Sequence, residues 1–286
     1  MQSIQDRISG RYGQLSERLK QAADFVVDHE VDIATHSLRS VSAKAGLAPS
    51  TFTRLSQALG FASYEEMKEL CRQRIGHQAM SFSERASLLV KSGSSGDARS
   101  FFERQVSASL ENLGKMERDI NQEQLGQVVD RLNDARQVLL FGAFSSTGFM
   151  EYLGYLARYF ADNWKVAGRM GASLSSAMVG LNEQDAVIIL TKAPYARRAI
   201  VAAQMAADAG AYVVVITDDI SCPALSYAST NFILPTESPQ FFSSYAATLV
   251  LIETLVGMLV ARAGDSARAR IEEVETRNHR YGEFWD

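Results

Sequence analysis

The sequence predicts an α/β protein in which an all-helical domain precedes a doubly wound, five-stranded parallel sheet. Apolar residues recur at helical spacing in the first part of the chain. In the second part, short apolar runs alternate with helical patterns, as expected for repeated βαβ units. A chain of 286 residues is also long enough for two ordinary domains.

Residues 38–60 have the pattern of a helix-turn-helix. Gly46 supplies the permissive backbone that a tight turn after a helix requires, and Pro49 suits the first turn of the next helix. Apolar residues fall at spacings that bury one face of two short helices against each other: Val41, Ala45, Leu47, Phe52, Leu55 and Leu59.

This segment also lacks acidic residues from Ile33 to Tyr64, although the formal charge of the whole chain is −4. A surface that faces phosphates must exclude carboxylates, so the gap favours double-stranded operator DNA as a partner. The alternative is that these are two amphipathic helices that pack in a helical domain and bind no DNA. The predicted DNA-binding residues are Arg39, Lys44, Ser50, Thr51, Thr53, Arg54 and Gln57.

Helical patterns surround this segment. We expect a first helix over 12–29 and another over 63–75, the latter opened by a capping box of Ser63 and Glu66. The helix-turn-helix domain is thus predicted to span 1–76. Residues 77–100, which include the glycine-rich run KSGSSGD, are predicted to be a linker. Helices over 101–120 and 121–133 would begin the second domain, 101–286.

The second domain reads as alternating strands and helices, and the longer strands are the nearly continuous apolar runs of a sheet covered on both faces. Ligands of such sheets bind beyond the carboxyl ends of the strands. The predicted strands are 136–142, 164–167, 186–191, 212–217 and 231–234, and the predicted helices between and after them are 148–160, 172–181, 195–209 and 240–262, with a C-terminal helix over 266–281.

The loops after the strands therefore supply the candidate ligand-binding residues. The first loop, GAFSSTG, places small residues and hydroxyls at a helix start, where backbone N–H groups can hold an anion. An ordinary serine-rich helix cap is an equally good interpretation. Arg197 and Arg198 could pair with an anion, but basic residues at a helix start are commonly just solvated. The predicted ligand-binding residues are Ser145, Ser146, Thr147, Thr191, Lys192, Glu237 and Ser238.

Composition excludes several classes of protein. Cys71 and Cys222 fit neither a disulfide framework nor a metal site, so we expect no metal, no cofactor and a reducing, cytoplasmic location. We expect no signal segment, because polar residues interrupt the first dozen positions. The apolar run 246–261 contains Glu253 and is short for a bilayer. We expect a buried or dimer-facing helix there, and no membrane partner.

The segment AKAGLAPSTFTRLSQALGFASYEEMKE resembles the N-terminal domain of the RpiR family of bacterial transcription regulators, in which a helix-turn-helix precedes a sugar isomerase (SIS) domain. The matching positions are Gly46, Thr51, Arg54, Leu59, Gly60 and Phe61. Ala48 departs from the family, which usually has a capping serine there.

The second domain is similar to SIS domains but departs from their phosphate loops. Ser146 lies on the characteristic serine of the first loop, whereas Phe144 stands where that loop normally has glycine. The second loop of the family is Ser-x-Ser-Gly-x-Thr. Here that pattern falls on Thr191, Ala193, Pro194 and Ala196, so two hydroxyls and a glycine are missing.

The resemblance implies a cytoplasmic regulator that binds operator DNA as a homodimer or homotetramer and senses a sugar phosphate or related anion. The altered loop leaves a less phosphorylated or differently charged effector open. One alternative is a SIS-fold sugar-phosphate isomerase, whose base would be Glu237, because all four histidines lie outside the strand-and-helix core. Another is a DNA-associated protein whose second domain binds no ligand. We predict no catalytic residue.

Overall fold

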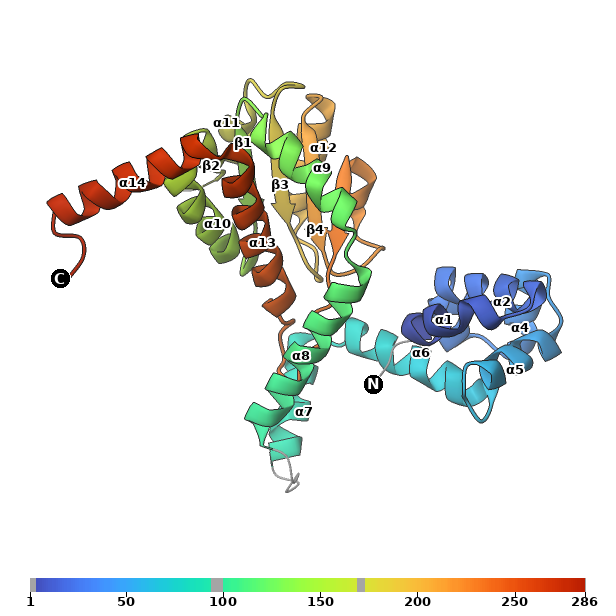
Figure 1. Ribbon diagram of the computed structural model, residues 1–286. Coiled ribbons are helices and arrows are strands. Elements are labelled where there is room, and N and C mark those ends of the chain that lie inside the picture. Colours follow the sequence, from blue (N-terminus) through green and yellow to red (C-terminus); the bar gives the residue numbers. More distant parts are fainter. Residues whose placement is uncertain (1–3, 94–99, 169–172, 286) are drawn as a thin grey trace. The chain divides into compact units, whose positions relative to one another are not determined.

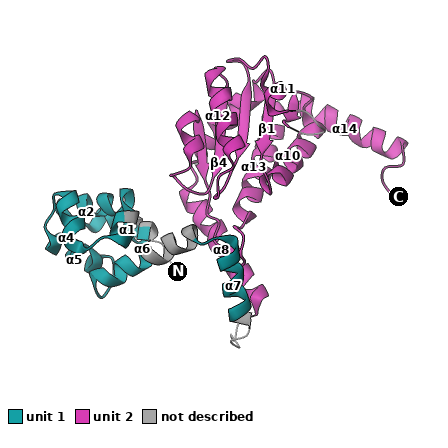
Figure 2. Ribbon diagram, turned by 180° about the vertical axis from the view of Figure 1, so that it is seen from behind, with its two compact units in different colours: residues 1–91 teal, residues 92–286 magenta. Residues whose placement is uncertain are grey.

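The computed structural model describes residues 4–93, 100–168 and 173–285 (Figure 1). The chain divides into two compact units, residues 1–91 and 92–286 (Figure 2). The first unit is all-helical, and the second contains a parallel sheet covered by helices. The α/β fold class predicted from the sequence is therefore confirmed.

Residues 4–71 of the N-terminal unit contribute to one core. Phe52 and Leu55 are fully buried there, and Phe25 and Tyr64 contact the Phe52 ring edge-on. The helices are α1 (Ile4–Arg11), α2 (Glu17–Asp28), α3 (Glu30–Thr35), α4 (Leu38–Ala45), α5 (Pro49–Ala58), α6 (Tyr64–Ala79) and α7 (Phe82–Gly93), with a 3₁₀ turn at Tyr12–Gln14.

Helices α4 and α5 form the expected helix-turn-helix. Gly46 ends α4 in the left-handed conformation at φ 66°, and its N–H group returns to the carbonyl groups of the last turn. Ser37 caps the start of α4 by accepting a hydrogen bond from the Ser40 N–H at 3.3 Å. Pro49 opens α5, and Ala48 before it provides no side-chain cap. The turn chemistry of the sequence is thus present in the structure.

One helical assignment in this unit was wrong, and the predicted linker contains helices. The first predicted helix, 12–29, is broken because Ser16 is extended, at φ −67° and ψ 157°, so that α2 begins at Glu17. The predicted linker contains the end of α6 and the whole of α7. Helix α7 starts with a capping box, in which Ser81 Oγ accepts from the Glu84 N–H at 3.2 Å and the Glu84 carboxylate accepts from the Ser81 N–H at 2.7 Å. Residues 94–99, at the centre of the glycine-rich run, lie outside the described residues.

The C-terminal unit contains five parallel strands in the order β2-β1-β3-β4-β5. The strands are β1 (Val138–Gly142), β2 (Trp164–Val166), β3 (Ala186–Leu190), β4 (Tyr212–Thr217) and β5 (Thr230–Ile233). The helices are α8 (Phe101–Asp119), α9 (Gln122–Asn133), α10 (Ser146–Phe160), α11 (Leu174–Met178), α12 (Arg197–Asp208), α13 (Ala246–Ala263) and α14 (Asp265–Arg280), with a 3₁₀ turn at Pro223–Tyr227.

Alternate residues of the central strands enter two separate cores. Leu140 and Ile188 point to one face of the sheet, where α9, α10 and α13 cover them (Figure 1). Their neighbours Leu139 and Val187 point to the other face, which α11 and α12 cover. Because both faces are covered, the strands are apolar throughout, which explains why continuous apolar runs identified them.

Helix α13 begins at Ala246, six residues later than the sequence suggested. The Ser244 carbonyl accepts a hydrogen bond from Lys192 instead of from the helix, and Tyr245 supplies the first helical acceptor. Among the described residues, α13 is the one helix long and apolar enough to cross a membrane by length and composition. Its Leu251 and Leu255 are nevertheless fully buried in the core of this unit.

Helix α11 is also shorter than the predicted 172–181. It ends at Met178, followed by an extended Val179 and by Gly180 at φ 79°. The predicted start at 172 lies outside the described residues.

A buried carboxylate secures the amino end of β3. Asp185 is 1% exposed and accepts two hydrogen bonds from Arg136, at 2.9 and 2.6 Å, and one from the Asn182 N–H at 2.9 Å. Burial alone would raise the pKa of the Asp185 carboxyl, but these hydrogen bonds outweigh it and the pKa is lowered. The pair therefore stabilises the fold when the carboxylate is charged.

We expect Asp185→Asn to lower the free energy of unfolding by about 2 kcal/mol at pH 7, since Arg136 is half exposed and water compensates part of its loss. A lowered pKa gives stability that is present above the ordinary value and is lost as pH falls through the folded-state value. The difference from wild type should therefore shrink below about pH 4. Urea unfolding followed by tryptophan fluorescence measures it. The exposed Asp208→Asn serves as control, and equal midpoints for the two variants would contradict the prediction.

Candidate functional site

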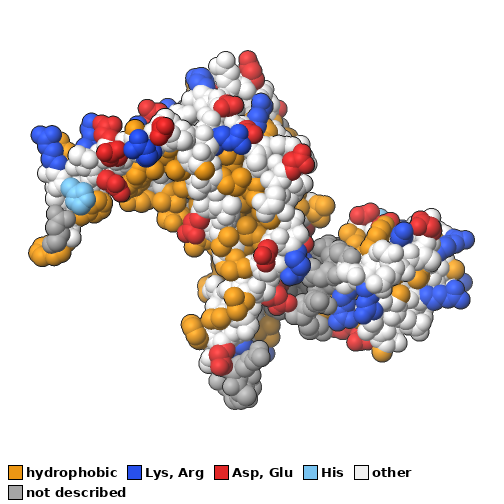
Figure 3. Space-filling view, viewed as in Figure 1, with side chains coloured by type: hydrophobic (Ala, Val, Ile, Leu, Met, Phe, Trp, Pro, Cys, Tyr) orange, Lys and Arg blue, Asp and Glu red, His pale blue; other side chains and the backbone are white. Residues whose placement is uncertain are grey.

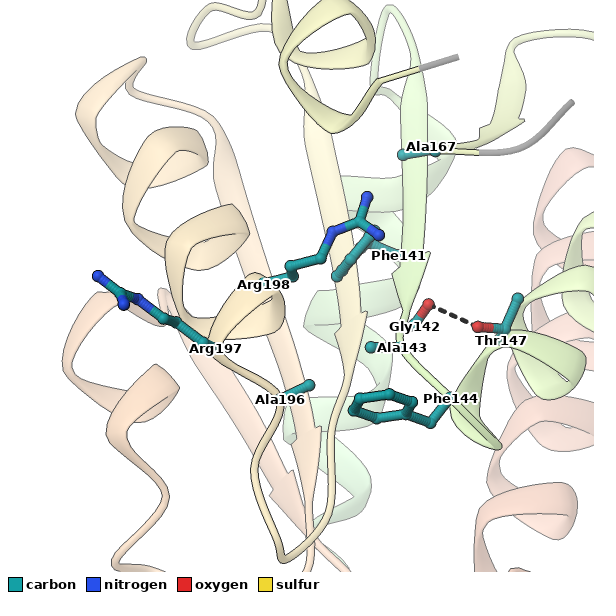
Figure 4. A pocket seen from close by; sticks show the side chains of 10 residues that line it. Phe141, Gly142, Ala143, Phe144, Thr147, Ala167, Ala196, Arg197 and Arg198 are labelled. Atoms are coloured by element: carbon teal, nitrogen blue, oxygen red, sulfur yellow. Dashed lines mark hydrogen bonds between the residues drawn. The ribbon is translucent and has the colours of Figure 1, made fainter. Parts of the chain in front are cut away.

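A pocket of about 350 Å³ opens at the carboxyl ends of β1 and β2 and at the start of α12 (Figure 4). This is where a doubly wound sheet places its ligands. The described residues that line it are mostly small or aromatic: Phe141, Gly142, Ala143, Phe144, Thr147, Ala167, Gly168, Ala196, Arg197 and Arg198.

The loop between β1 and α10 is tightly folded against the helix start. A Cβ atom on Gly142 would lie 2.5 Å from the Ser146 carbonyl oxygen, so a side chain cannot be accommodated there without a backbone shift. Phe144 has φ 53°, a left-handed conformation that glycine adopts readily and a phenylalanine rarely does. Thr147 Oγ1 donates to the Gly142 carbonyl at 2.9 Å. The loop thus places the exposed Phe144 ring beside the pocket.

The two serines of this loop contact Tyr245. Ser145 Oγ and Ser146 Oγ share hydrogen bonds with the Tyr245 hydroxyl at 2.9 and 3.0 Å. The Tyr245 ring stacks on Phe149 of α10, with centroids 4.2 Å apart and an interplanar angle of 6°. Tyr245, which the sequence did not single out, therefore holds the hydroxyls of two of the predicted ligand-binding residues.

Lys192 lies on the other side of Tyr245. Its side chain is 7% exposed, its Nζ donates to the Ser244 carbonyl at 2.9 Å, and Nζ lies 3.9 Å from the centre of the Tyr245 ring. Burial lowers the pKa of Lys192 to about 7, although the nearby Asp218 carboxylate raises it in part. Burial likewise raises the pKa of the Asp218 carboxyl, although it accepts hydrogen bonds from the Ala193 N–H. Lys192 thus titrates near neutral pH.

The other candidates lie away from the pocket lining. Thr191 is 3% exposed at the end of β3, where its N–H bonds to the Ile216 carbonyl. The backbone of Glu237 is held by α8, because Asn112 Nδ2 donates to its carbonyl at 2.8 Å and its N–H donates to Asn112 Oδ1 at 3.1 Å. Ser238 Oγ faces Gln105 of the same helix at 3.5 Å. Thr147 is the predicted ligand residue that lines the pocket.

Two arginines at the start of α12 complete the lining. The Arg198 guanidinium lies 5.8 Å from the centre of the Phe141 ring and extends toward Ala167. The Arg197 side chain points away from the pocket (Figure 4). The sequence showed that both positions are basic, but it could not indicate which of the two side chains faces the pocket. None of the described lining residues carries a carboxylate or an imidazole.

The predicted DNA-binding residues lie on α4 and α5 with different exposure. Arg39, Ser50, Arg54 and Gln57 are exposed, and the last three recur on one face of α5. Lys44 forms an ion pair with Asp32 at 2.5 Å, so its charge is partly neutralised. Thr51 is partly buried, and Thr53 Oγ1 donates to the Pro49 carbonyl at 3.3 Å.

Comparison with known proteins agrees with this architecture. Residues 131–258 match the SIS domain family. The Vibrio vulnificus NanR protein in complex with ManNAc-6P superposes with a TM-score of 0.57 at 17% identity, covering 98% of this chain and 99% of that one. The sugar isomerase domain of an RpiR transcription factor from Sphaerobacter thermophilus gives a TM-score of 0.57 at 20% identity, covering 60% of this chain and 96% of that one.

Curated relatives align with most of this chain. The proteins named "Bifunctional protein glk" from Burkholderia mallei and Burkholderia thailandensis are 24% identical over 270 residues, which is 93% of this chain. The chain spans only 41% of the length of these relatives. The sheet region of the C-terminal unit therefore matches the SIS domain family over residues 131–258, and a helix-turn-helix unit precedes it.

Proposed function

We propose that the protein is a cytoplasmic transcription regulator that binds operator DNA through α4 and α5. Its SIS domain would bind a small anionic metabolite, a sugar phosphate or a related anion, and thereby modulate operator affinity. The observation that carries the proposal is the exposed, acid-free face of α5 in a chain that also contains a ligand-sized pocket.

The DNA-binding part rests on the chemistry of that face. Ser50, Arg54 and Gln57 lie four and three residues apart on α5, so one helix face presents a hydroxyl, a guanidinium and an amide. These groups hydrogen-bond to phosphates and base edges in a major groove. Arg39 adds an exposed positive charge on α4. The second helix of the motif is therefore the proposed recognition helix.

We expect Arg54→Ala to weaken binding to a duplex from the upstream region of the protein's own gene by about 1–3 kcal/mol. Fluorescence anisotropy at several salt concentrations measures the affinity, and loss of a phosphate contact would also reduce the salt dependence. Lys20→Ala is the matched control, because Lys20 lies on α2 and its charge already pairs with Glu17 at 2.8 Å. Equal weakening by both variants would show that net charge, and not the α5 face, determines the affinity.

The sensing part rests on the pocket at the strand ends and on the relatives. NanR is a protein of similar fold that was determined with ManNAc-6P. Here Arg198 and Thr147 line the pocket at the carboxyl ends of the strands. Effector binding would change the relative placement of two DNA-binding units and so alter the half-site spacing that they can bridge. Effector saturation that leaves operator affinity unchanged would refute this step.

Homo-oligomerisation, as a dimer or tetramer, is part of the proposal. Apolar side chains are exposed over the helices of the C-terminal unit (Figure 3), which is typical of a subunit interface. They include Phe102 and Leu110 of α8, which are 75% and 63% exposed, and Val250 of α13. Light scattering of the purified chain tests this, and a monomer at micromolar concentration would count against it.

The isomerase alternative requires a general base beside the ligand. Glu237, the residue considered for that role, is exposed on the segment held by α8, and the described pocket lining has no carboxylate or imidazole. Both observations favour the regulator. The third possibility is a DNA-associated protein whose second domain binds no ligand. In that case no member of a broad metabolite panel would change the melting temperature of the purified chain.

A further inference from the structure

The pocket has a lining that suits an apolar molecule better than a sugar. Half of its ten described lining residues have apolar side chains: Phe141, Ala143, Phe144, Ala167 and Ala196. A sugar brings several hydroxyl groups, and each of them loses water on binding and needs a hydrogen-bond partner in return. Apart from the two arginines, Thr147 has the one polar side chain among the described lining residues, and its Oγ1 already donates to the Gly142 carbonyl.

The hydroxyls that could serve a sugar or a phosphate are engaged elsewhere. Ser145 and Ser146 both bond to Tyr245, outside the pocket lining. The loop after β3 reaches the pocket through Ala196, which has no polar side-chain atom. A phosphate dianion, with three oxygens to satisfy, is therefore poorly matched to this site.

Of the two arginines among the described lining residues, Arg198 turns its side chain to the pocket. The Arg198 guanidinium extends across the Phe141 ring, while Arg197 points away (Figure 4). A guanidinium binds a carboxylate through two parallel hydrogen bonds, so the geometry of Arg198 matches a carboxylate. On the loop after β1, Phe144 has a left-handed backbone conformation that is unfavourable for a phenylalanine, and it is 84% exposed. Such strain at a site is typical of a residue retained for binding.

We propose that this pocket binds a small monocarboxylate with a flat apolar body. Its carboxylate pairs with Arg198, and its body lies against Phe141 and Phe144. The assignment rests on the proposed sensing function, for which it names the class of effector.

Four probes separate the head group from the body of the ligand. Phenylacetate and phenyl phosphate carry an apolar body, and gluconate and fructose 6-phosphate carry a polyol. Titration calorimetry on the full chain is expected to show phenylacetate binding at least about tenfold more tightly than each of the other three. Equal or tighter binding of gluconate, phenyl phosphate or fructose 6-phosphate overturns the proposal, as does an absence of phenylacetate binding at millimolar concentration.

Three variants then assign the contacts. Arg198→Ala should weaken phenylacetate binding about tenfold or more, whereas Arg197→Ala, which removes an equal charge from the neighbouring position, should change it about twofold or less. Phe144→Gly relieves the backbone strain and should still weaken binding severalfold, because the apolar wall is lost. Equal effects of the two arginine variants would overturn the role of Arg198.

The same titrations repeated with the labelled upstream duplex distinguish this inference from the proposed function. Operator binding that fructose 6-phosphate alters and phenylacetate does not would retain the regulator and overturn the carboxylate assignment. Phenylacetate binding that depends on Arg198, in a chain that binds no DNA at any salt concentration, would retain the assignment and overturn the regulator.

Discussion

Replacement of Lys192 by methionine is expected to remove a pH dependence of stability between pH 7 and pH 10. In the folded chain, burial lowers the pKa of Lys192 to about 7 from its ordinary value of 10.5. Between these values the unfolded chain binds a proton that the folded chain does not, so wild-type stability rises with pH. The change is up to about tenfold in the folding equilibrium per pH unit, or about 4 kcal/mol in total.

Methionine keeps most of the volume of the lysine side chain and cannot be charged. At pH 7 the variant should be at least as stable as wild type, although it loses the hydrogen bond to the Ser244 carbonyl. Urea unfolding at several pH values measures the difference. Both tryptophans, Trp164 and Trp285, lie in the C-terminal unit, so their fluorescence reports on the unit that contains Lys192.

The exposed Lys165→Met of β2 is the control for the lysine experiment, and its stability should follow the wild-type pH curve. A wild-type curve that runs parallel to that of Lys192→Met would show that Lys192 is charged and well solvated in the folded chain.

Gly142→Ala is expected to destabilise the C-terminal unit by about 3 kcal/mol or more. The added Cβ atom would lie 2.5 and 2.7 Å from the carbonyl oxygen and carbon of Ser146, which are backbone atoms at the start of α10. Relief of this overlap requires either β1 or the helix start to move. The helix start also positions Ser145, Ser146 and Thr147, so ligand binding should be lost along with stability.

Gly148→Ala is a matched control in the first turn of the same helix, where an added Cβ meets no atom within 4 Å among the described residues. Because alanine favours helix more than glycine does, this variant should gain up to about 1 kcal/mol. The melting temperatures of both variants are measured by thermal unfolding. An equal decrease for both would show that the loop tolerates no added methyl group at either position, and would contradict the specific role of the Gly142 contact.

The sheet could be predicted from the sequence because its strands are buried on both faces. Val187 to Ile189 and Val213 to Ile216 are apolar without interruption, so no knowledge of their partners was needed to find them. The same holds for the turn at Gly46, whose left-handed conformation is a local property. Helix α7 was not predicted, because the glycine and serine residues near its end are typical of a linker. The capping box at Ser81 and Glu84, which marks its start, is the local signal that could have identified it.

The site was less predictable because its contacts join distant parts of the chain. Tyr245 binds Ser145 and Ser146 across 100 and 99 positions, and no local pattern around Tyr245 indicates this. Lys192 seemed available to an anion, yet it turns to the Ser244 carbonyl 52 positions later. Three-dimensional packing, and not the local sequence, determines which side of a loop a hydroxyl or an ammonium group faces.

The pair of hydrogen bonds between Asn112 and Glu237 has a consequence for synthesis of the chain on the ribosome. The Asn112 amide presents to the backbone N–H and carbonyl of one residue, Glu237, the acceptor and the donor that a neighbouring strand would present, and it does so across 125 positions. Helix α8 emerges before every strand of the sheet, but this connection must wait until the segment after β5 has left the exit tunnel. Until then the buried Asn112 lacks the Glu237 backbone as its partner, so this connection forms only after all five strands have been made.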